Sequence, residues 1–323
     1  MKIRTYVSDS NNAWHNLAVD EFLLNSVGKD EIILYLYINS DSVIIGKNQN
    51  AWKECNIESM NRDGVKLVRR ITGGGAVFHD LNNLNFSFIS SKDLYDVKRQ
   101  FGVILKALES VGLKAEFSSR NDLTINGRKF SGNAFCEKKH ASQHHGTLLI
   151  NTDLSRLSDY LNVSEKKIQS KGISSVRARV INLKELNEKL DTALMSSLLL
   201  AAFESEYGIS QPVVFSDPDL EQIALLEEKH SSWEWRLGES PSFTTELGDR
   251  FTWGEIQIFL DVRGSRITGV KVFTDSLDTE LSEKLENLLA GQLYMGKSLY
   301  DAVTASDIPD RFDIAELITR EIP

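Results

Sequence analysis

Residues 65–90 read VKLVRRITGGGAVFHDLNNLNFSFIS, and this stretch says most about the fold and the function of the chain. Its apolar and β-branched runs predict three short strands around a glycine loop, namely Val65–Arg70, Ala76–His79 and Leu84–Ser90. Three consecutive glycines cost backbone entropy and bring no side-chain packing, so they indicate close approach of the backbone to something. Bare N–H groups in such a turn suit an anion, and Arg69 and Arg70 would add positive charge. A plain hairpin loop with surface arginines is the alternative; the charged flanks favour the anion site.

Similar runs elsewhere predict an α/β fold of the α+β kind. Further strands are expected over Ile32–Ile38, Ser42–Gly46, Lys114–Ser118, Asp122–Ile125, Arg128–Ala134 and Thr147–Asn151. Helices are expected over Asn12–Val27, Glu54–Arg62, Asp93–Val111, Leu154–Leu161, Ser164–Gln169 and Leu183–Tyr207. Because the strands follow one another too closely for repeated βαβ crossovers, the sheet of the large domain should be mostly antiparallel.

A polar region that contains Pro212, Pro218 and Pro241 predicts a domain boundary near Ser240–Asp249. Beyond it, apolar and polar residues alternate up to a turn at 263–265, which predicts a β-hairpin. Three helices should follow, over Glu280–Leu289, Leu299–Ala305 and Ile314–Arg320. We therefore expect a large domain over residues 1–243 and a small α+β accessory domain over residues 250–323.

Composition excludes several classes of protein. The chain has 323 residues, 41% of them hydrophobic, and a net charge of −9, which is typical of a soluble protein and argues against a general nucleic-acid binder. No apolar run approaches the ~18–20 residues of a membrane span, and the first residues lack a secretory apolar core. Cys55 and Cys136 do not have disulfide-framework or metal-site spacing. We expect a cytoplasmic protein without membrane contact, and a monomer because no coiled-coil pattern is visible.

A second informative segment runs from Arg120 to Ala134 and reads RNDLTINGRKFSGNA. Asn126-Gly127 is a strong signal for a two-residue hairpin turn. Lys129 lies just beyond that turn, where it is either a solvated edge residue or a point charge that reaches a bound phosphate. Asp122 lies on the other side of the turn and is open to three readings: an N-cap, a strand-end hydrogen bonder or a magnesium ligand.

Two further segments carry histidines and arginines. His144 and His145 are adjacent, so on a strand they point to opposite faces, which disfavours a shared metal. His145 stands before Gly146 and is the better candidate for hydrogen bonding to a ligand. Arg177 and Arg179 would lie on one face of an extended segment, and a solvated basic strand is the simpler interpretation.

Taken in order, four segments resemble the lipoate–protein ligases, specifically the long bacterial type: RRITGGGAVFHD, RNDLTINGRKFSGNAF, HHGTLLINTDLSRL and KGISSVRARVINL. The resemblance extends to NLAVDEFLL, WKECN, SSWEW, FTWG and VFTDSL, and therefore covers nearly the whole chain. It implies an α/β large domain with an antiparallel sheet, shared with biotin–protein ligases, and a small C-terminal domain. It also implies that the small domain rotates after adenylation, for which a linker near Ser240–Asp249 would be suited.

The resemblance implies an enzyme with a two-step reaction. (R)-Lipoate and ATP, accompanied by Mg²⁺, give lipoyl-AMP and pyrophosphate. The lipoyl group then passes to a lysine on a lipoyl domain of a 2-oxoacid dehydrogenase complex or on the glycine cleavage H protein. The second step needs a neutral amine, which is rare at pH 7 without desolvation or a nearby base.

Roles for individual residues also follow from the resemblance. Lys129 corresponds to the lysine that bridges the lipoate carboxylate and the α-phosphate. ATP binding is implied for Arg70, Gly75, Ala76, Val77, Phe78 and Lys129. Lipoate binding is implied for Lys129, Thr72, Gly74 and His145. Asp122 is the candidate for the magnesium ion or for the base of the second step.

Two other functions remain as alternatives. An ATP-independent lipoyl- or octanoyltransferase would form a thioester on a cysteine shortly after the His-Gly strand, but residues 159–163 carry no thiol. A non-catalytic lipoate-binding protein is disfavoured because both Arg70 and Lys129 are present. A biotin–protein ligase would carry a GRGR-type loop, which is missing. The sequence does not rank lipoate against octanoate, since one apolar tunnel accepts both.

Overall fold

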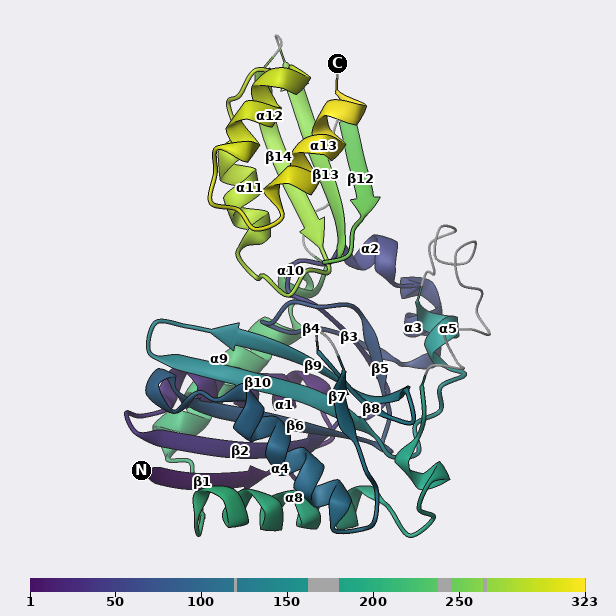
Figure 1. The fold of residues 1–323 in the computed structure, drawn as a ribbon, viewed down its shortest axis with the longest axis vertical. Coiled ribbons are helices and arrows are strands. Elements are labelled where there is room, and N and C mark those ends of the chain that lie inside the picture. Colours follow the sequence, from purple (N-terminus) through teal and green to yellow (C-terminus); the bar gives the residue numbers. More distant parts are fainter. Residues whose placement is uncertain (119–120, 162–179, 238–244, 264–265, 323) are drawn as a thin grey trace. The chain divides into compact units, whose positions relative to one another are not determined.

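The computed structural model describes the chain except for residues 119–120, 162–179, 238–244, 264–265 and 323 (Figure 1). The expected helix Ser164–Gln169, the Arg177 and Arg179 pair and part of the expected domain boundary lie outside the described residues. The chain divides into two compact units, and each is described by itself. Unit 1 comprises residues 1–44, 52–69 and 77–236, and unit 2 comprises residues 45–51, 70–76 and 237–323.

Unit 1 is built on an eight-stranded mixed sheet with the order β11-β1-β2-β6-β10-β9-β8-β7. Its strands are β1 (Lys2–Val7), β2 (Glu31–Ile38), β6 (Asn83–Ser91), β7 (Glu116–Ser118), β8 (Asp122–Ile125), β9 (Arg128–Glu137), β10 (Ala141–Leu149) and β11 (Gln211–Pro212). β1 runs parallel to β2 and β11, and all other neighbours are antiparallel. The expectation of a mostly antiparallel sheet is therefore confirmed. A smaller sheet has the order β4-β3-β5, from β3 (Ser42–Ile45), β4 (Lys66–Arg69) and β5 (Val77–His79).

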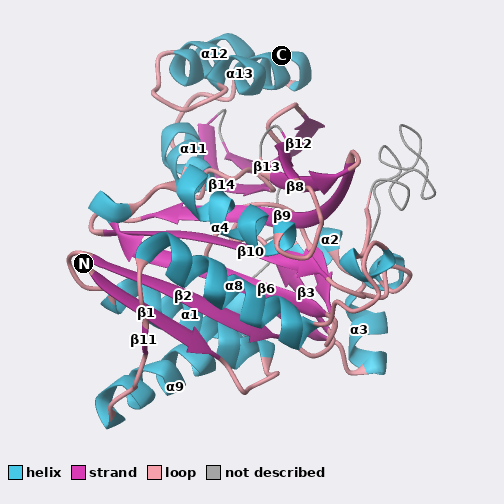
Figure 2. Cartoon of the chain, turned by 60° about the horizontal axis from the view of Figure 1, so that its bottom comes forward, coloured by secondary structure: helices cyan, strands magenta, loops and turns pink. Residues whose placement is uncertain are grey.

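Helices cover both faces of the large sheet (Figure 2). One face packs against α4 (Val97–Glu109) and α8 (Thr192–Tyr207), and alternate strand residues such as Leu34, Phe86 and Leu148 join those helices in one apolar core. The other face meets α1 (Ala13–Ser26), which in turn packs against α9 (Asp217–Ser231). Since side chains alternate along a strand, the residues between the core positions point toward α1. The remaining short helices of unit 1 are α3 (Ile57–Asp63), α5 (Leu157–Tyr160), α10 (Trp233–Arg236) and the 3-10 turns η1 (Lys92–Leu94) and η2 (Leu183–Glu185).

Several boundaries differ from the sequence-based expectations. The helix expected over Leu183–Tyr207 is divided into η2 and α8, and Asp191 caps the second part by accepting a hydrogen bond from the Leu194 backbone N–H at 2.7 Å. The helix expected from Asp93 starts at Val97, because Asp96 caps it. β10 begins at Ala141 instead of Thr147, since its polar residues Ser142–His145 are buried and so break the apolar signal. β1, α9 and α10 had no sequence-based expectation.

Unit 2 contains a three-stranded antiparallel sheet of β12 (Thr245–Arg250), β13 (Glu255–Arg263) and β14 (Arg266–Thr274). The helices α11 (Leu281–Leu289), α12 (Gly296–Thr304) and α13 (Arg311–Glu321) pack on one face of it (Figure 1), around a core that includes Ile256, Ile258 and Leu260. The segments 45–51 and 70–76 join this unit through hydrogen bonds to the residues after β14. α2 (Ala51–Glu54) starts at the end of the first of them. Among the described helices, none combines the length and the apolar composition that crossing a membrane requires.

Candidate active site

A register shift in the β8–β9 hairpin decides which residue of β9 lies on the same face as Lys129. The turn residues Asn126 and Gly127 have φ values of 51° and 73°, as a two-residue type I′ turn needs. Lys129 and Ser131 pair with the consecutive residues Thr124 and Leu123, so β9 contains a bulge. The bulge breaks the alternation of faces, and Lys129 therefore shares a face with Gly132. A Cβ atom on Gly132 would lie only 3.1 Å from Lys129 Nζ.

The Lys129 ammonium group is paired with a carboxylate. Lys129 Nζ lies 2.7 Å from Asp122 Oδ1, and both side chains are about one-third exposed (39% and 32%). Asp122 thus forms an ion pair across the hairpin, which was not among the three roles considered for it from the sequence. The positive charge is thus held beside the backbone of Gly132, which has no side chain of its own to displace it.

Hydrogen bonds between Asn121 and Asn133 fix the start of β8, next to Asp122. The Asn121 side chain donates to the Asn133 carbonyl at 2.7 Å, and the Asn133 backbone N–H and side chain donate to the Asn121 carbonyl at 3.0 and 2.9 Å. Asn133 Oδ1 lies 2.9 Å from Nε2 of the buried His144, whose Nδ1 faces Gln100. Burial lowers the pKa of His144 from 6.5 to about 3. His144 is therefore a neutral core residue. The two adjacent histidines have different surroundings, in agreement with the expectation that they point to opposite faces.

His145 points to the other face of the sheet, toward α1. Its Nδ1 lies 3.0 Å from Oδ2 of Asp20, and both side chains are almost fully buried. His145 shares a rung with Ser87 on β6 and Tyr35 on β2, so this face carries a row of polar groups. Gly146 does not leave space for a ligand, because a Cβ there would lie 2.7 Å from Phe86 and 2.7 Å from the Gly132 carbonyl. Its small size serves the packing of strands.

The glycine loop in unit 2 is organised by Arg70. The guanidinium donates to the Thr72 hydroxyl at 3.1 Å, to the Gly73 carbonyl at 2.6 and 3.0 Å and to the Gly75 carbonyl at 2.9 Å. Gly74 has a φ of 94°, which only glycine adopts without strain. The N–H of Gly74 donates to the Ser276 carbonyl at 3.1 Å. No atom lies within 4 Å of the position that a Cβ atom on Gly75 would occupy, so this is the glycine of the loop at which the backbone can be approached.

Val77 and Phe78 belong to β5 in unit 1. Phe78 is buried, with its ring 5.7 Å from the ring of Tyr160 and the Arg156 guanidinium 5.0 Å above it. Val77 is only partly buried. The structure thus encloses the Phe78 ring in protein and leaves Val77 nearer to solvent.

Arg69 does not add charge to the glycine loop, contrary to the sequence-based interpretation. Its buried guanidinium donates to the backbone carbonyls of Trp235 and Arg236, both at 2.8 Å. Adjacent strand residues point to opposite sides, so Arg69 turns toward α10 while Arg70 turns into the loop. Burial lowers the pKa of Arg69 to about 10. Trp235 belongs to the SSWEW segment, which is among those singled out from the sequence. No sequence pattern predicts that it contacts Arg69, which lies 166 positions away.

The candidate residues therefore fall into two groups. Lys129, Asp122, His145, Val77 and Phe78 lie in unit 1, while Arg70, Thr72 and Gly74–Ala76 lie in unit 2. Within unit 1 the structure brings Lys129 and Asp122 together, and it gives His145 a different partner, Asp20. The described residues contain no cluster of three or more His, Cys, Asp or Glu side chains that would hold a metal ion by themselves. A single carboxylate such as Asp122 fits Mg²⁺ that is held mainly by phosphate oxygens.

Comparison with known proteins shows the family of the chain. The model of the lipoyl protein ligase A/B catalytic domain matches residues 12–204, and the model of the bacterial lipoate protein ligase C-terminus matches residues 240–322. The solved structure of P. falciparum LipL1 in complex with lipoate is 29% identical and covers 99% of this chain and 100% of its own, with a TM-score of 0.87.

Two further solved structures are similar over the larger part of the chain. A bi-partite lipoate protein ligase from Thermoplasma acidophilum, from a study that includes its E2 lipoyl domain, is 30% identical and covers 76% of this chain and 100% of its own, with a TM-score of 0.68. A lipoate-protein ligase A bound with ATP is 29% identical and covers 74% of this chain and 99% of its own, with a TM-score of 0.66. The chain belongs to the lipoate–protein ligase family.

Proposed function

We propose that the chain activates lipoate with ATP and transfers the lipoyl group to a lysine of lipoyl domains. The observation that carries the proposal is the Lys129 ammonium group, held 2.7 Å from Asp122 and lying over the backbone of Gly132. The similar structures with bound lipoate and with bound ATP support the two substrates. The E2 lipoyl domain studied with the T. acidophilum relative supports the acceptor, and the glycine cleavage H protein is proposed as a second acceptor of the same kind.

In the first step a carboxylate oxygen of lipoate attacks the α-phosphorus of ATP, and the bond to pyrophosphate breaks. Both reactants are anions, so the main task of the protein is to place positive charge and N–H donors before the reaction. Lys129 supplies that charge. Arg70 and the segment Gly75–Phe78 contact the nucleotide. Asp122 would hold the Mg²⁺ that accompanies ATP, and the ion would supply positive charge that neutralises the phosphates.

In the second step the acceptor amine attacks the acyl carbon, and AMP leaves. Lys129, Thr72, Gly74 and His145 are proposed to contact the lipoyl group. The alternative role proposed for Asp122, in place of holding Mg²⁺, is that of proton acceptor for the acceptor amine once Lys129 turns to the acyl phosphate. We place the catalytic domain at residues 1–243 and an accessory domain at residues 250–323.

The thiol chemistry of a transferase finds no support in the described cysteines. Cys55 is buried, and burial raises the pKa of its thiol to about 12. The thiolate, which is the nucleophile, is therefore scarce at neutral pH. Cys136 lies on β9 after the pair formed by Asn133 and His144, and it is not adjacent to Lys129.

The test is lipoate-dependent exchange of radioactive pyrophosphate into ATP. Wild-type protein should catalyse exchange, and Lys129→Ala should lower the rate by roughly 10²–10³-fold, as the loss of a preorganised donor does. Arg128→Ala is the matched control, because Arg128 is the next residue on β9 but pairs with the exposed Glu185. Lipoate binding without exchange in the wild type would support the binding-protein alternative. Equal loss in both variants would show that Lys129 has no special role.

A further inference from the structure

Two tryptophans complete the open edge of β4. This strand ends the order β4-β3-β5, so among the described residues one of its sides has no neighbouring strand. The indole N–H of Trp14 donates to the Leu67 carbonyl at 3.0 Å, and that of Trp235 donates to the Arg69 carbonyl at 2.9 Å. Carbonyls two residues apart point to the same side of a strand, so the two indoles take the places of successive partners.

The contact with Trp235 is reciprocal. While the Trp235 indole donates to the Arg69 carbonyl, the Arg69 guanidinium donates to the carbonyl of Trp235 and to that of Arg236. α10 is held for this contact by Ser232, whose hydroxyl accepts from the Trp235 backbone N–H at 3.2 Å. Lys229 Nζ lies 4.2 Å above the indole ring and is itself paired with Glu21 of α1 at 2.7 Å. The indole is therefore held by the Arg69 carbonyl and the Lys229 ammonium group, while the backbone of Trp235 is held by Ser232 and by the Arg69 guanidinium.

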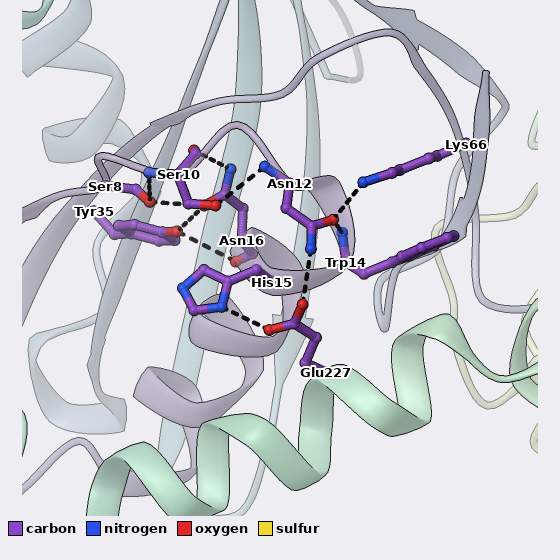
Figure 3. Close-up of polar contacts among 9 residues, drawn as sticks. All are labelled: Ser8, Ser10, Asn12, Trp14, His15, Asn16, Tyr35, Lys66 and Glu227. Atoms are coloured by element: carbon purple, nitrogen blue, oxygen red, sulfur yellow. Dashed lines mark hydrogen bonds and ion pairs between the residues drawn. The ribbon is translucent and has the colours of Figure 1, made fainter. Parts of the chain in front are cut away.

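The helix that leads to Trp235 is also fastened to α1 and β4 (Figure 3). Glu227 on α9 accepts from the Asn12 side chain at 2.7 Å and lies 2.8 Å from His15 Nδ1. The same Asn12 accepts from Lys66 of β4 at 2.9 Å. Figure 3 shows Asn12 between Glu227 and Lys66, so one side chain joins the three elements. These contacts fix the position of α9, which leads directly into α10.

The bond to Trp235 acts on the peptide group from which the glycine loop starts. The carbonyl of this group belongs to Arg69 and accepts from Trp235, while its N–H belongs to Arg70 and donates to the Ile45 carbonyl at 3.0 Å. A peptide group is planar, so fixing both of its polar atoms fixes its orientation. That orientation sets the direction in which the Arg70 side chain leaves the backbone. Arg70 in turn organises the loop through the carbonyls of Gly73 and Gly75.

We infer that Trp235 is a positioning residue for ATP binding, acting through the Arg69–Arg70 peptide group on Arg70. The inference rests on the proposed function, because it takes Arg70 as a nucleotide contact. Trp235 itself does not touch the substrate in this inference. Its effect should therefore be larger for ATP, which Arg70 itself contacts in the proposal, than for lipoate, which contacts only Thr72 and Gly74 of the loop; a general loss of stability would affect both ligands equally.

The test uses Trp235→Phe, which keeps an aromatic ring but removes the N–H donor. A typical hydrogen bond contributes about 1 kcal/mol, so the dissociation constant for ATP and the KM for ATP should rise roughly 3- to 10-fold. The dissociation constant for lipoate without ATP, measured by calorimetry, should stay within about twofold. Trp233→Phe is the matched control, since Trp233 lies on the same helix with 44% exposure. Trp14→Phe removes the same bond at Leu67, two residues further from the loop, and should have a smaller effect.

The inference is wrong if Trp235→Phe binds ATP as well as Trp233→Phe does, or if its affinities for ATP and lipoate fall equally. Direct ATP binding keeps this outcome separate from the proposed function. Wild-type protein that binds ATP without pyrophosphate exchange would overturn the proposed function, while the effect of Trp235→Phe on ATP affinity would still decide the inference. Wild-type protein that does not bind ATP would overturn both.

Discussion

Replacement of Gly73 by alanine tests how the glycine loop is held within unit 2. A Cβ atom at this position would lie 2.2 Å from the Ser276 carbonyl oxygen, 2.9 Å from Leu277 Cα and 3.0 Å from Leu277 carbonyl carbon. All three atoms belong to the backbone, so no rotation of a side chain relieves the overlap. The loop and residues 276–277 must separate by roughly 1 Å, which is the kind of shift that overpacked sites undergo.

The expected cost has two parts. Overpacking of a tight site costs about 1–3 kcal/mol. The separation also stretches the 3.1 Å hydrogen bond from the Gly74 N–H to the Ser276 carbonyl, which contributes about 1 kcal/mol. Together, Gly73→Ala should lower the free energy of unfolding of unit 2 by about 2–4 kcal/mol, out of the 5–15 kcal/mol that is common for a domain.

Neighbouring glycines supply the controls. Gly75→Ala should be nearly neutral for stability, because nothing lies within 4 Å of its Cβ position. Gly74→Ala should fall between the two, since its φ of 94° is strained for alanine but the nearest atom, Arg70 Nη2 at 2.7 Å, can move. Urea unfolding and hydrogen exchange at the Gly74 amide measure the series. Equal effects of Gly73→Ala and Gly75→Ala would refute the close packing of the loop on Ser276.

Two predictions concern pH. Burial lowers the pKa of His144 from 6.5 to about 3, so below pH 6.5 the unfolded chain binds a proton that the folded chain does not. The free energy of unfolding should therefore fall by about 2 kcal/mol between pH 6.5 and 5. His144→Gln should remove this part of the pH dependence. For Glu21, burial raises the pKa, but hydrogen bonds from His230 and Lys229 outweigh burial and lower it from 4.5 to about 2. The contribution of Glu21 to the free energy of unfolding is therefore complete above pH 4.5 and lost as the pH falls toward 2. Glu21→Gln should lower the free energy of unfolding by about 1–3 kcal/mol at pH 7 and weaken its dependence on pH below 4.5. Denaturant unfolding at a series of pH values measures both; slopes that the variants leave unchanged would contradict the assignments.

Elements whose cause is local were predictable from the sequence. The strands around the glycine loop, the Asn126-Gly127 turn and the helix that Asn12 caps all appear, because alternation, turn residues and caps act over a few positions. Strand β10 was placed too late because its polar residues are buried against other polar groups, and no apolar alternation marks such a strand.

Within the candidate site, long-range geometry was out of reach of the sequence. The partners of Arg69 come from Trp235 and Arg236, and that of His145 comes from Asp20, so both depend on how distant elements meet. The placement of Lys129 beside Gly132 depends on a bulge, which no residue type in the hairpin specifies. The sequence thus identified the charged residues, and the fold decided which of them face one another.

The bulge in β9 also has a consequence for how freely this hairpin can change in length. Two residues lie between Lys129 and Gly132 on β9, but only Leu123 lies between their partners on β8, and this difference places Lys129 and Gly132 on the same face. Residues added at the tip, between Ile125 and Arg128, leave that difference untouched. One residue added between Lys129 and Gly132, with the bulge kept, would turn the lysine away from Gly132 with every candidate residue still present. Spacing, and not only residue identity, is therefore what an alignment of this segment must preserve.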